Sequence, residues 1–473
     1  MLIDLQLTQK NTNYGEFDFL IIGAGVAGTV LAKSLASSGK KIALIEGGGS
    51  EYSELSQNFY KGLVTGDPYY DLDITRLRFF GGSSNHWAGM SRSFEKIDFE
   101  RKYLGNIYRW PIKFDDIEKY KKKACEILEI SSEFEDNEEI DSNIKSIVFN
   151  ISNVNFKEKY YKEFLLDQNI SLFINANLTK FNGENRKINS IDIQSLNGNK
   201  LELSTKKIVV ATGGIENCRI LLWIDKFYPD FFFEKNLPIG KYWMEHPHFT
   251  LGKAIIDKKK ISKTRTYYSL KGNLQKKLGI LNCGFRINHL DEINTKELIR
   301  DLTCVAPKLG NKLAKLAGKN LVCGAVFRAA WEQSPSIDSM VSLTNELDGF
   351  GIPRVNLHWK KNKFDRATLK KSIAAFNEWL LNSDNGRLNI YDWISKDLSY
   401  PIDDELGGNH HMGGTRMHES KNYGVVNSNC KVYGSDNLYV AGSSLFTTGG
   451  HNNPTLPIVQ LALRLSDHLT KII

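Results

Sequence analysis

The chain carries two adjacent histidines, His410 and His411, in a stretch that continues with glycine, threonine and arginine. A neutral imidazole takes up a proton close to neutral pH, so histidine suits the removal of a hydroxyl proton from an alcohol. Taken alone, either histidine is more often a packed interior group than a catalytic one. Further along, Asn453 precedes Pro454 and Thr455. Its amide is suited to hydrogen-bond an alcohol oxygen, although Asn before Pro is also typical of a helix N-cap followed by a proline at the first helical position.

A second candidate site is rich in glycine and lies near the N-terminus. Gly23, Gly25 and Gly28 follow a strand predicted at Asp18–Ile22 and begin a predicted helix that continues to about Ser38. Glycines at this spacing allow a sharp turn, a close approach of the backbone to a pyrophosphate and tight packing of helix on strand. The N-terminus of the helix then faces the phosphate charge.

Glu46 ends a second predicted strand, Lys41–Ile45. An acidic residue at this distance from the glycines is expected to hydrogen-bond a ribose hydroxyl, which argues against a ribose 2′-phosphate. The strand–helix–strand unit therefore predicts a dinucleotide site. By itself it does not distinguish NAD from FAD.

Gly81, Gly82, Ser83 and Ser84 form a further loop. Such a loop is able to present backbone N–H groups to a phosphate or to the polar edge of a flavin, and a glycine-rich surface turn is the alternative. Later in the chain, Lys207–Ala211 is typical of a buried strand and is predicted to return to the first sheet.

Five segments, taken in order, resemble the glucose-methanol-choline (GMC) oxidoreductases, a family of FAD enzymes. Several motifs in the right order are far more specific than any one of them. The segments are Arg78-Phe-Phe-Gly-Gly-Ser-Ser-Asn-His-Trp-Ala-Gly89, Ala211-Thr-Gly-Gly-Ile-Glu-Asn-Cys-Arg-Ile-Leu-Leu222, His410-His-Met-Gly-Gly-Thr-Arg-Met417, Asn437-Leu-Tyr-Val-Ala-Gly-Ser-Ser444 and Gly449-Gly-His-Asn-Asn-Pro-Thr455.

The resemblance implies that the dinucleotide is FAD. A helix predicted from Thr455 would point its N-terminus at the flavin pyrimidine, where reduction leaves negative charge. Besides the glycine turn, Glu46 and the loop at 81–84, the residues expected to bind the cofactor are Asn85, His86, Ala211, Thr212, Gly213, Gly442, Asn453, Pro454 and Thr455.

The resemblance leaves the mode of attachment at His86 open. In some members a histidine at the matching position carries the flavin covalently, whereas others with the same His-Trp pair bind it without a bond. Covalent attachment and simple packing near the flavin are both compatible with the sequence.

The resemblance also implies roles at the reaction site. His411 aligns with the catalytic histidine of the family because it stands four residues before Thr415, and it is expected to be the base. Asn453 matches the family's second polar residue, which contacts the substrate oxygen. His410 is either a partner of His411 or a packed imidazole, and His451 is the alternative to Asn453, since some members use two histidines.

Two stretches favour a structural interpretation. Glu245-His-Pro-His248 matches a family stretch and is interpreted as domain-junction structure. The run Lys308–Lys319 is more typical of a solvated lysine-rich helix face than of a helix at a membrane surface. Met340 stands where the family usually has arginine, so the substrate contacts do not transfer directly.

Composition excludes several classes of protein. The chain has 473 residues, 41% hydrophobic and 25% charged, and its net charge of +8 comes from 62 basic and 54 acidic residues, so it describes a mixed surface and not a nucleic-acid-binding arm. The six cysteines are widely spaced with no CxxC pair, no metal site is predicted, and the N-terminus lacks the apolar run of a signal peptide. A soluble, cytoplasmic protein without a membrane span is expected.

The predicted fold combines α/β and α+β parts. Residues 1–245 and 405–473 are expected to build a discontinuous Rossmann-like FAD-binding domain, and residues 246–404 a largely antiparallel sheet that binds substrate. A helix is expected near Ala367–Leu381. The site would lie where the two parts meet.

The predicted function is oxidation of an alcohol, a sugar, polyol or related secondary alcohol, to a carbonyl by hydride transfer to flavin N5 with a histidine base. Oxygen, a quinone or a protein partner would reoxidise the flavin. The alternatives are a lyase of the hydroxynitrile-lyase type, which retains FAD without net redox chemistry, and an NAD-dependent dehydrogenase that uses only the first strand–helix–strand unit.

Overall fold

The first sheet is organised around the predicted strand–helix–strand unit. The computed structural model describes residues 1–8, 13–257, 266–288 and 321–472. In it β2 (Phe17–Ile22) and β3 (Ile42–Ile45) are parallel neighbours joined by α1 (Val26–Ala36). Both strands are almost wholly buried, as expected for the centre of a parallel sheet covered on both faces.

This sheet extends to both sides of the unit. Its order is β1-β8-β3-β2-β11-β10-β9, and β19 also pairs with β11. The pairs from β1 to β11 and the β11–β19 pair are parallel, whereas β9, β10 and β11 form an antiparallel meander. The remaining strands are β1 (Leu2–Asp4), β8 (Ile170–Ile174), β9 (Asn177–Glu184), β10 (Lys187–Gln194), β11 (Lys200–Val210) and β19 (Leu438–Val440).

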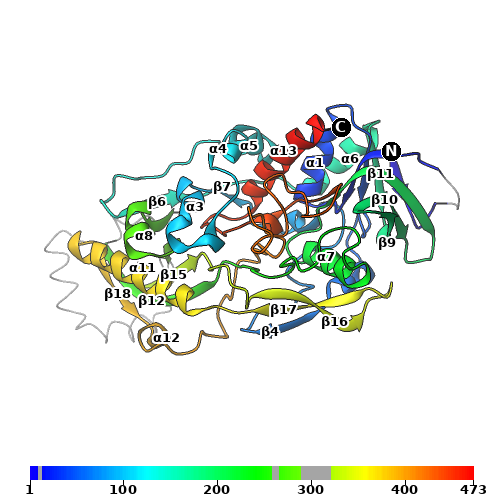
Figure 1. Cartoon of the computed structure of the whole chain (residues 1–473). Helices are drawn as coiled ribbons and strands as arrows, with labels where there is room; N and C mark the ends of the chain where they lie inside the picture. Colours follow the sequence, from blue (N-terminus) through cyan, green and yellow to red (C-terminus); the bar gives the residue numbers. More distant parts are fainter. Residues whose placement is uncertain (9–12, 258–265, 289–320, 473) are drawn as a thin grey trace.

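Helices from distant parts of the sequence cover this sheet. The C-terminal helix α13 (Thr455–Lys471) lies beside α1, so both ends of the chain contribute to one layer (Figure 1). Pairing of β11 with β2 and with β19 confirms that Lys207–Ala211 returns to the first sheet. The other helical segments before the second sheet are α2 (Glu54–Gln57), η1 (Asn58–Tyr60), η2 (Gly82–Asn85), α3 (Lys96–Phe99), η3 (Arg101–Leu104), η4 (Asn106–Tyr108), α4 (Asp115–Glu118), α5 (Lys121–Leu128), α6 (Phe156–Leu166) and α7 (Glu216–Phe227).

The second sheet has six strands in the order β18-β12-β15-β14-β13-β6, all paired antiparallel. One face packs on α11 (Lys363–Asn382), where Phe376 stacks on Phe285 with ring centroids 4.8 Å apart. The strands are β6 (Ile144–Val148), β12 (His248–Asp257), β13 (Thr266–Leu270), β14 (Cys283–Asn288), β15 (Leu321–Trp331) and β18 (Gly386–Ile390), and the short helices nearby are α8 (Gly272–Leu278) and α12 (Asp392–Ser395).

The helix expected near Ala367–Leu381 is confirmed as α11, which begins earlier, at Lys363. Its N-cap is Asn362, whose side chain accepts hydrogen bonds from the backbone N–H groups of Phe364 and Asp365. Asp365 in turn accepts from the backbone N–H of Asn362, which completes a capping box.

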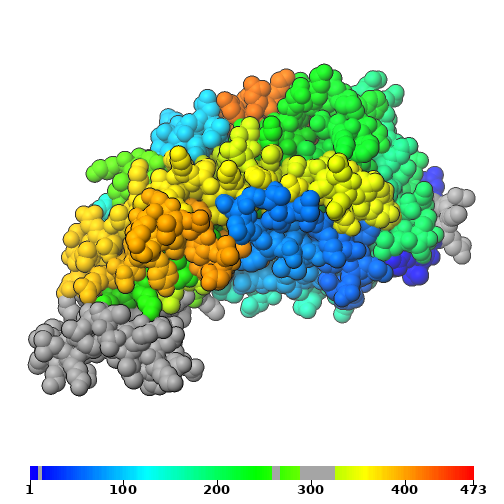
Figure 2. All heavy atoms as spheres, turned by 90° about the horizontal axis from the view of Figure 1, so that it is seen from below, coloured from blue at the N-terminus to red at the C-terminus, as the bar shows by residue number. Residues whose placement is uncertain are grey.

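Strands from the first part of the chain also enter the second part. A three-stranded sheet joins β16 (Met340–Leu347) and β17 (Pro353–Trp359) to β4 (Leu63–Gly66), and its β17–β4 pair is parallel. Figure 2 shows the blue β4 segment lying against the yellow strands on this face. Together with β6, β4 carries residues before 245 into sheets formed mainly by 246–404. The division of the chain into two domains at residues 245 and 405 stays a prediction. The sheets do not follow this division, because β4 and β6 pair with strands from the other side of it.

Several further expectations concern absences. Among the described residues, no helix combines the length and apolar character needed to cross a membrane. Within the same residues no cluster of three or more His, Cys, Asp or Glu is arranged to hold a metal ion. The run Lys308–Lys319 lies outside the described part of the chain.

The remaining short elements are β5 (Met90–Ser91), β7 (Asn150–Ile151) and η5 (Ser443–Leu445).

Candidate active site

One cavity of about 730 Å³ runs between the glycine turn of the first sheet and the open face of the second. Its volume is in the range of sites that bind cofactors and small molecules. Both sheets and the segments between them contribute to its wall. The first sheet supplies Gly23 and Gly25, and the second supplies Arg286 and Arg328.

The three glycines of the turn have different roles. At Gly23 φ is +102°, and an added Cβ would lie 2.6 Å from the carbonyl oxygen of Ala211. At Gly28 an added Cβ would lie 1.8 Å from the carbonyl oxygen of Gly23, so only glycine allows α1 to pack this closely on the turn. Gly25 has no heavy atom within 4 Å of the Cβ position and lines the cavity. The turn thus leaves backbone open to a ligand at Gly25.

Glu46 lies at the end of β3 and also lines the cavity. Its carboxylate accepts hydrogen bonds from the backbone N–H groups of Ala24, at 3.1 Å, and Gly48, at 2.9 Å. Burial raises the pKa of this carboxyl, against the opposing effect of these N–H donors and of Arg78. The Glu46 carboxylate therefore lies at the cavity wall. Its contact with a ribose hydroxyl stays a prediction.

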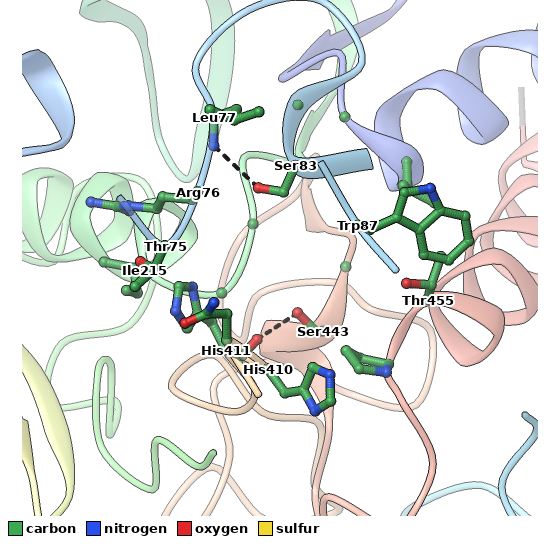
Figure 3. Close-up of a pocket in the computed structure, with 18 of the residues that line it drawn as sticks. Thr75, Arg76, Leu77, Ser83, Trp87, Ile215, His410, His411, Ser443 and Thr455 are labelled. Carbon is green, nitrogen blue, oxygen red and sulfur yellow. Dashed lines mark hydrogen bonds between the residues drawn. The ribbon is translucent and has the colours of Figure 1, made fainter. Parts of the chain in front are cut away.

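The loop at 81–84 folds against the glycine turn. Gly81 and Gly82 have positive φ values of +91° and +55°, and an added Cβ on Gly82 would lie 3.3 Å from Gly25 Cα. The backbone N–H of Leu77 donates to Ser83 Oγ at 3.2 Å (Figure 3). Gly82, Ser83 and Ser84 line the cavity, whereas Gly81 and Asn85 are absent from its wall and shape the loop behind it.

His86 and Trp87 follow this loop and both line the cavity. Burial lowers the pKa of the His86 imidazole. The Trp87 ring nitrogen donates to the carbonyl oxygen of Val154 at 3.0 Å, which fixes the direction of the ring. The geometry places His86 beside the cavity and leaves its mode of contact with a flavin a prediction.

Strand ends from β11 and β19 meet in the wall of the cavity. Ala211, Thr212, Gly213 and Gly442 all line it. Asn217 ties the two strand ends together, because its side-chain oxygen accepts from the Thr212 backbone N–H at 2.7 Å and its amide donates to the carbonyl oxygen of Ala441 at 2.9 Å. The carboxyl ends of parallel strands are the usual place for a ligand site in such sheets.

The start of α13 differs from the expected capping arrangement. The N-cap is Pro454 and the first helical residue is Thr455, so Pro454 does not occupy the first helical position. In the described part of the chain no side chain caps this helix. Asn453 lines the cavity together with Pro454 and Thr455. The interpretation of Asn453 as an N-cap is therefore wrong, and its side chain is free for another contact.

His411, the predicted base, packs against aromatic rings. Its Nε2 lies 3.2 Å from the Tyr69 hydroxyl oxygen, and its ring centroid is 5.7 Å from that of Trp243. The residue is 8% exposed, and burial lowers the pKa of its imidazole to about 3, with a further contribution from Arg76. Figure 3 shows its ring on the side of Thr75 and Ile215.

His410 takes a different direction. Figure 3 shows its ring on the side that leads to Thr455. Its Nδ1 lies 2.8 Å from Nδ1 of His246, whose Nε2 lies 2.8 Å from the carbonyl oxygen of Gly450. The backbone N–H of His410 donates to the Glu245 carboxylate. Both histidines of the pair line the cavity, and His246 lines it with them.

His451 lines the cavity too, next to a charged cluster. Its Nε2 lies 3.4 Å from Glu95, which also pairs with Lys145 at 2.7 Å and Arg92 at 2.9 Å. Although burial opposes the change, these three neighbours hold the pKa of Glu95 well below its usual range. The roles of His451 and Asn453 at the substrate stay predictions.

The sequence motifs do not predict two residues of the site. Tyr69 belongs to no motif, yet it contacts both His411 and Glu245. The stretch that contains His246 favours a structural interpretation, whereas His246 lines the cavity beside His410. The Glu-His-Pro-His stretch before β12 was the available signal for His246.

A family comparison supports the resemblance seen in the motifs. Residues 335–462 match the model of the GMC oxidoreductase family, whose description is "GMC oxidoreductase". This match includes β16, β17, α11, the histidine pair and the start of α13. It does not include the glycine turn.

Two curated proteins are similar in sequence. The C-glycoside 3-oxidase of Microbacterium trichothecenolyticum is 26% identical over 161 residues, which are 33% of this chain and 27% of that protein. The 2-methyl-1,2-propanediol dehydrogenase of Mycolicibacterium austroafricanum is 24% identical over 297 residues, which are 59% of this chain and 50% of that protein. The aligned regions thus span half of these relatives or less.

Solved structures share the fold over nearly the whole chain. A formate oxidase of Aspergillus oryzae matches with a TM-score of 0.55 and 14% identity over 98% of this chain and 99% of that one. A pyridoxine 4-oxidase, described as from Mesorbium loti, has a TM-score of 0.60 with 13% identity, and an FAD-dependent oxidoreductase of Chaetomium thermophilum has 0.62 with 13%, each over 96% of this chain and 99% of the other. The motifs, the match of residues 335–462 to the family model and the shared fold all indicate similarity to the GMC oxidoreductases.

Proposed function

We propose that this chain binds FAD and oxidises the CH–OH group of an alcohol to a carbonyl. The observation that carries the proposal is that one cavity contains the glycine turn, the loop at Gly82–Ser84, the pair His410–His411 and Asn453. The first two features suit a dinucleotide, and the last two suit proton transfer from an alcohol. A single cavity holds the cofactor and the reacting group in contact, as such a reaction requires.

The residues around the turn fit a flavin dinucleotide. Gly25 leaves open space where the backbone would approach the pyrophosphate, and the N-terminus of α1 follows directly. Glu46 would accept from the ribose, while Ser83 and Ser84 would face the phosphates or the flavin edge. FAD bound there would supply the acceptor for the hydride that leaves the alcohol carbon.

At the other part of the cavity, the chain binds and deprotonates the alcohol. The Asn453 amide donates to the alcohol oxygen and steadies the charge that develops on it. An imidazole of the pair His410–His411 takes the hydroxyl proton. The N-terminus of α13, which begins at Thr455, offers a positive field beside this site. Trp331 of the second sheet also lines the cavity.

The cavity wall favours a substrate with several hydroxyl groups. Arg286, Arg328, Glu405 and His248 line it and combine hydrogen-bond donors with an acceptor. Arg328 pairs with Glu405, and His248 Nδ1 lies 3.6 Å from the same carboxylate. Such a mixed polar wall suits a sugar or polyol, and the named activities of the two curated relatives, on a C-glycoside and a diol, favour the same class.

The test is an anaerobic screen of the purified protein. We expect a yellow protein whose flavin absorbance is bleached by at least one compound from a panel of sugars, polyols, sugar nucleotides and 2-methyl-1,2-propanediol. A colourless protein would favour the NAD-dependent alternative. A yellow protein that no compound bleaches would favour the lyase. Addition of air or a quinone to the bleached protein then identifies an acceptor, and a failure of both points to a protein partner.

We further propose that the FAD is held without a covalent bond to His86. Burial disfavours charging of this imidazole, and the cavity wall supplies many other contacts for the flavin. Acid denaturation is expected to release the yellow colour into solution. Colour that stays with the precipitated wild-type chain but is released from a His86→Ala variant would establish the covalent bond instead.

A further inference from the structure

The second sheet turns one of its faces to the cavity. Successive side chains of a strand point to opposite faces of the sheet. On β14 and β15, Phe285 and Phe327 are buried and stack with each other beside α11. The neighbouring positions, Arg286 and Arg328, line the cavity and are directly opposite one another in the antiparallel register. The face toward the cavity therefore carries two positive charges side by side.

Arg328 has its charge compensated by carboxylates. Its Nη2 lies 2.5 Å from Glu405 Oε2 and 3.5 Å from Asp404 Oδ1. Asp404 is held in place on β12, because it accepts from the backbone N–H of Thr250 at 2.6 Å. Hydrogen bonds from His248 and Arg328 hold the pKa of Glu405 below its ordinary value against the opposing effect of burial, so this carboxyl is ionised at neutral pH.

Arg286 lacks such compensation. Within residues 1–8, 13–257, 266–288 and 321–472 no carboxylate forms an ion pair with it, and its guanidinium lies 5.9 Å from the ring centroid of Tyr267. By contrast Arg76, another arginine of the cavity wall, pairs with Glu216 at 3.0 Å. Like charges directly opposite each other in a sheet are unfavourable, and a guanidinium does not lose its proton. An anion in the cavity would relieve this repulsion.

Small residues leave room for a ligand beside Arg286. Gly284 precedes it by two positions on the same face of β14, and Ala330 is directly opposite Gly284 on β15. An added Cβ on Gly284 would lie 3.7 Å from the Ala330 carbonyl oxygen and 3.8 Å from the Tyr267 ring, which are ordinary contacts. The backbone therefore does not require glycine here. We call this space, with Gly284 and Ala330 as its floor and Arg286 at its side, the sheet hollow.

The sheet hollow continues toward the histidine pair. His248 of β12 is directly opposite Ala330, and its ring centroid lies 6.1 Å from that of His410. Both histidines line the cavity. Neighbouring strands are about 4.8 Å apart, so β12 and β14 are separated by about 10 Å. A substrate whose reacting alcohol lies at His410 would therefore extend along this row toward Arg286.

We propose that the substrate is an acidic sugar or polyol derivative whose carboxylate or phosphate group binds Arg286 in the sheet hollow. The guanidinium presents paired N–H donors that match the oxygens of such a group. Arg328, already paired with Glu405, offers its remaining donors to hydroxyl groups. The inference rests on the proposed function for the oxidation of the alcohol. Binding of the acidic group does not depend on it.

The first test measures binding and needs no turnover. Isothermal titration calorimetry of the holoenzyme without oxygen compares matched pairs of ligands: D-glucuronate with D-glucuronamide, D-galacturonate with D-galacturonamide, and α-D-glucose 1-phosphate with methyl α-D-glucopyranoside. We expect at least one acid to bind about 10–100-fold more tightly than its neutral partner, which is the contribution of hydrogen bonds to a charged group. The pair that shows the preference distinguishes a carboxylate from a phosphate. The absence of a preference in every pair, including the absence of binding, would overturn the proposal.

The second test assigns the preference to Arg286. Arg286→Gln should lower the affinity for the preferred acid to that of its neutral partner and leave the neutral partner and the flavin content unchanged. The matched control is Arg387→Gln, which makes the same change of charge at an exposed position on β18 of the same sheet, outside the cavity wall. It should keep the preference. An equal loss in both variants, or loss of flavin from Arg286→Gln, would overturn the proposal, because the arginine would then act at long range or on the cofactor.

The third test separates space from charge. Gly284→Val keeps a residue suited to a strand and fills the sheet hollow, so it should weaken both members of the preferred pair by about tenfold or more. Thermal unfolding of the same preparations checks that each variant is folded. Unchanged affinities in folded Gly284→Val would place the sugar elsewhere and overturn the proposal.

Rapid mixing connects this site to the reaction. If the preferred acid bleaches the flavin, Arg286→Gln should raise its half-saturating concentration by about 10–100-fold with little change in the limiting rate, because the contact is made equally in the ground and transition states. A fall in the limiting rate alone would contradict a role in binding. A wild-type holoenzyme that prefers acids but is bleached by no compound would refute the proposed function and leave the anion site standing.

Discussion

At the glycine turn the wall of the cavity is backbone, whereas around His410 it consists of side chains whose protons are fixed by one another. The turn depends on space, because an added Cβ at Gly23 or Gly28 would meet a carbonyl oxygen at 2.6 or 1.8 Å. The histidine end depends on hydrogen-bond direction, which the carbonyl oxygen of Gly450 determines through His246.

The two regions therefore tolerate change differently. A methyl group at Gly23 or Gly28 is enough to disrupt the turn, while a substitution at the histidine end can keep the shape of the cavity and change only its hydrogen bonds. Substitutions in the first region should reveal themselves in folding and flavin content, and substitutions in the second in the rate of flavin reduction.

The largest effect is expected for Gly28→Ala. The new Cβ would lie 1.8 Å from the carbonyl oxygen of Gly23, and that oxygen belongs to the backbone of the turn, so α1 must move off the sheet. We expect the unfolding free energy to fall by about 3 kcal/mol or more, which is the upper end of the effects of overpacking a core. We also expect the purified variant to contain no bound flavin. Thermal unfolding and the absorbance of the purified protein measure both.

Gly25→Ala is the matched control. Nothing lies within 4 Å of its Cβ position, and its φ of −78° is ordinary for alanine. The flavin-free protein should keep its unfolding free energy within about 0.5 kcal/mol. Its affinity for FAD should fall by about tenfold or more, because the methyl group occupies space needed by the pyrophosphate. Unchanged flavin affinity would contradict the placement of the pyrophosphate at Gly25.

A smaller effect, on rate alone, is expected for Asn453→Ala. Loss of one donor to a developing oxyanion slows catalysis by about 10²-fold. Stability should stay unchanged, because the N-cap of α13 is Pro454 and not Asn453. Rapid-mixing reduction and thermal unfolding of the same preparation separate the two readouts.

Asn362→Ala supplies the opposite control. Asn362 does cap a helix, since its side chain accepts from the backbone N–H groups of Phe364 and Asp365. We expect it to lose about 1 kcal/mol of stability with a normal rate of flavin reduction. If Asn453→Ala behaved in the same way, its proposed contact with the alcohol would be wrong.

The sequence predicted the turn well because its constraint is local. A strand, three glycines, a helix and a second strand follow one another from Phe17 to Ile45, and glycine spacing reports directly on where the backbone needs room. Motif order predicted FAD as the cofactor, and this stays a proposal. The return of Lys207–Ala211 to the first sheet was also predictable, since a continuous apolar strand needs burial on both faces.

The sequence did not predict that His410 and His411 point in different directions. Both residues have the same side chain, and alignment on Thr415 favours His411 without reporting the direction of either ring. The contacts that decide it come from far away, since Tyr69 is 342 positions from His411 and His246 is 164 from His410. The placement of β4 and β6 in the sheets of the second part was missed for the same reason.

The smallest expected effect is a difference in pH dependence between the two regions. Burial lowers the pKa of His411 from its ordinary 6.5 to about 3, so between these values the unfolded chain binds more protons than the folded one. Its contribution to stability is present above pH 6.5 and is lost as the pH falls. Burial raises the pKa of Glu46 above 4.5, so its contribution is present below pH 4.5 and is lost as the pH rises.

The two substitutions should therefore change the pH profile in opposite directions. Between pH 6.5 and 4.5, His411→Gln should make the acid loss of unfolding free energy shallower by about 1 kcal/mol or more, since one unit of pKa corresponds to about 1.4 kcal/mol. Glu46→Gln should make the loss steeper, because it removes a contribution that grows as the pH falls. Denaturant unfolding of the flavin-free protein at several pH values measures both slopes. Equal slopes of unfolding free energy against pH in the two variants would contradict this prediction. They would mean that Glu46 or His411 is less buried than in the structure.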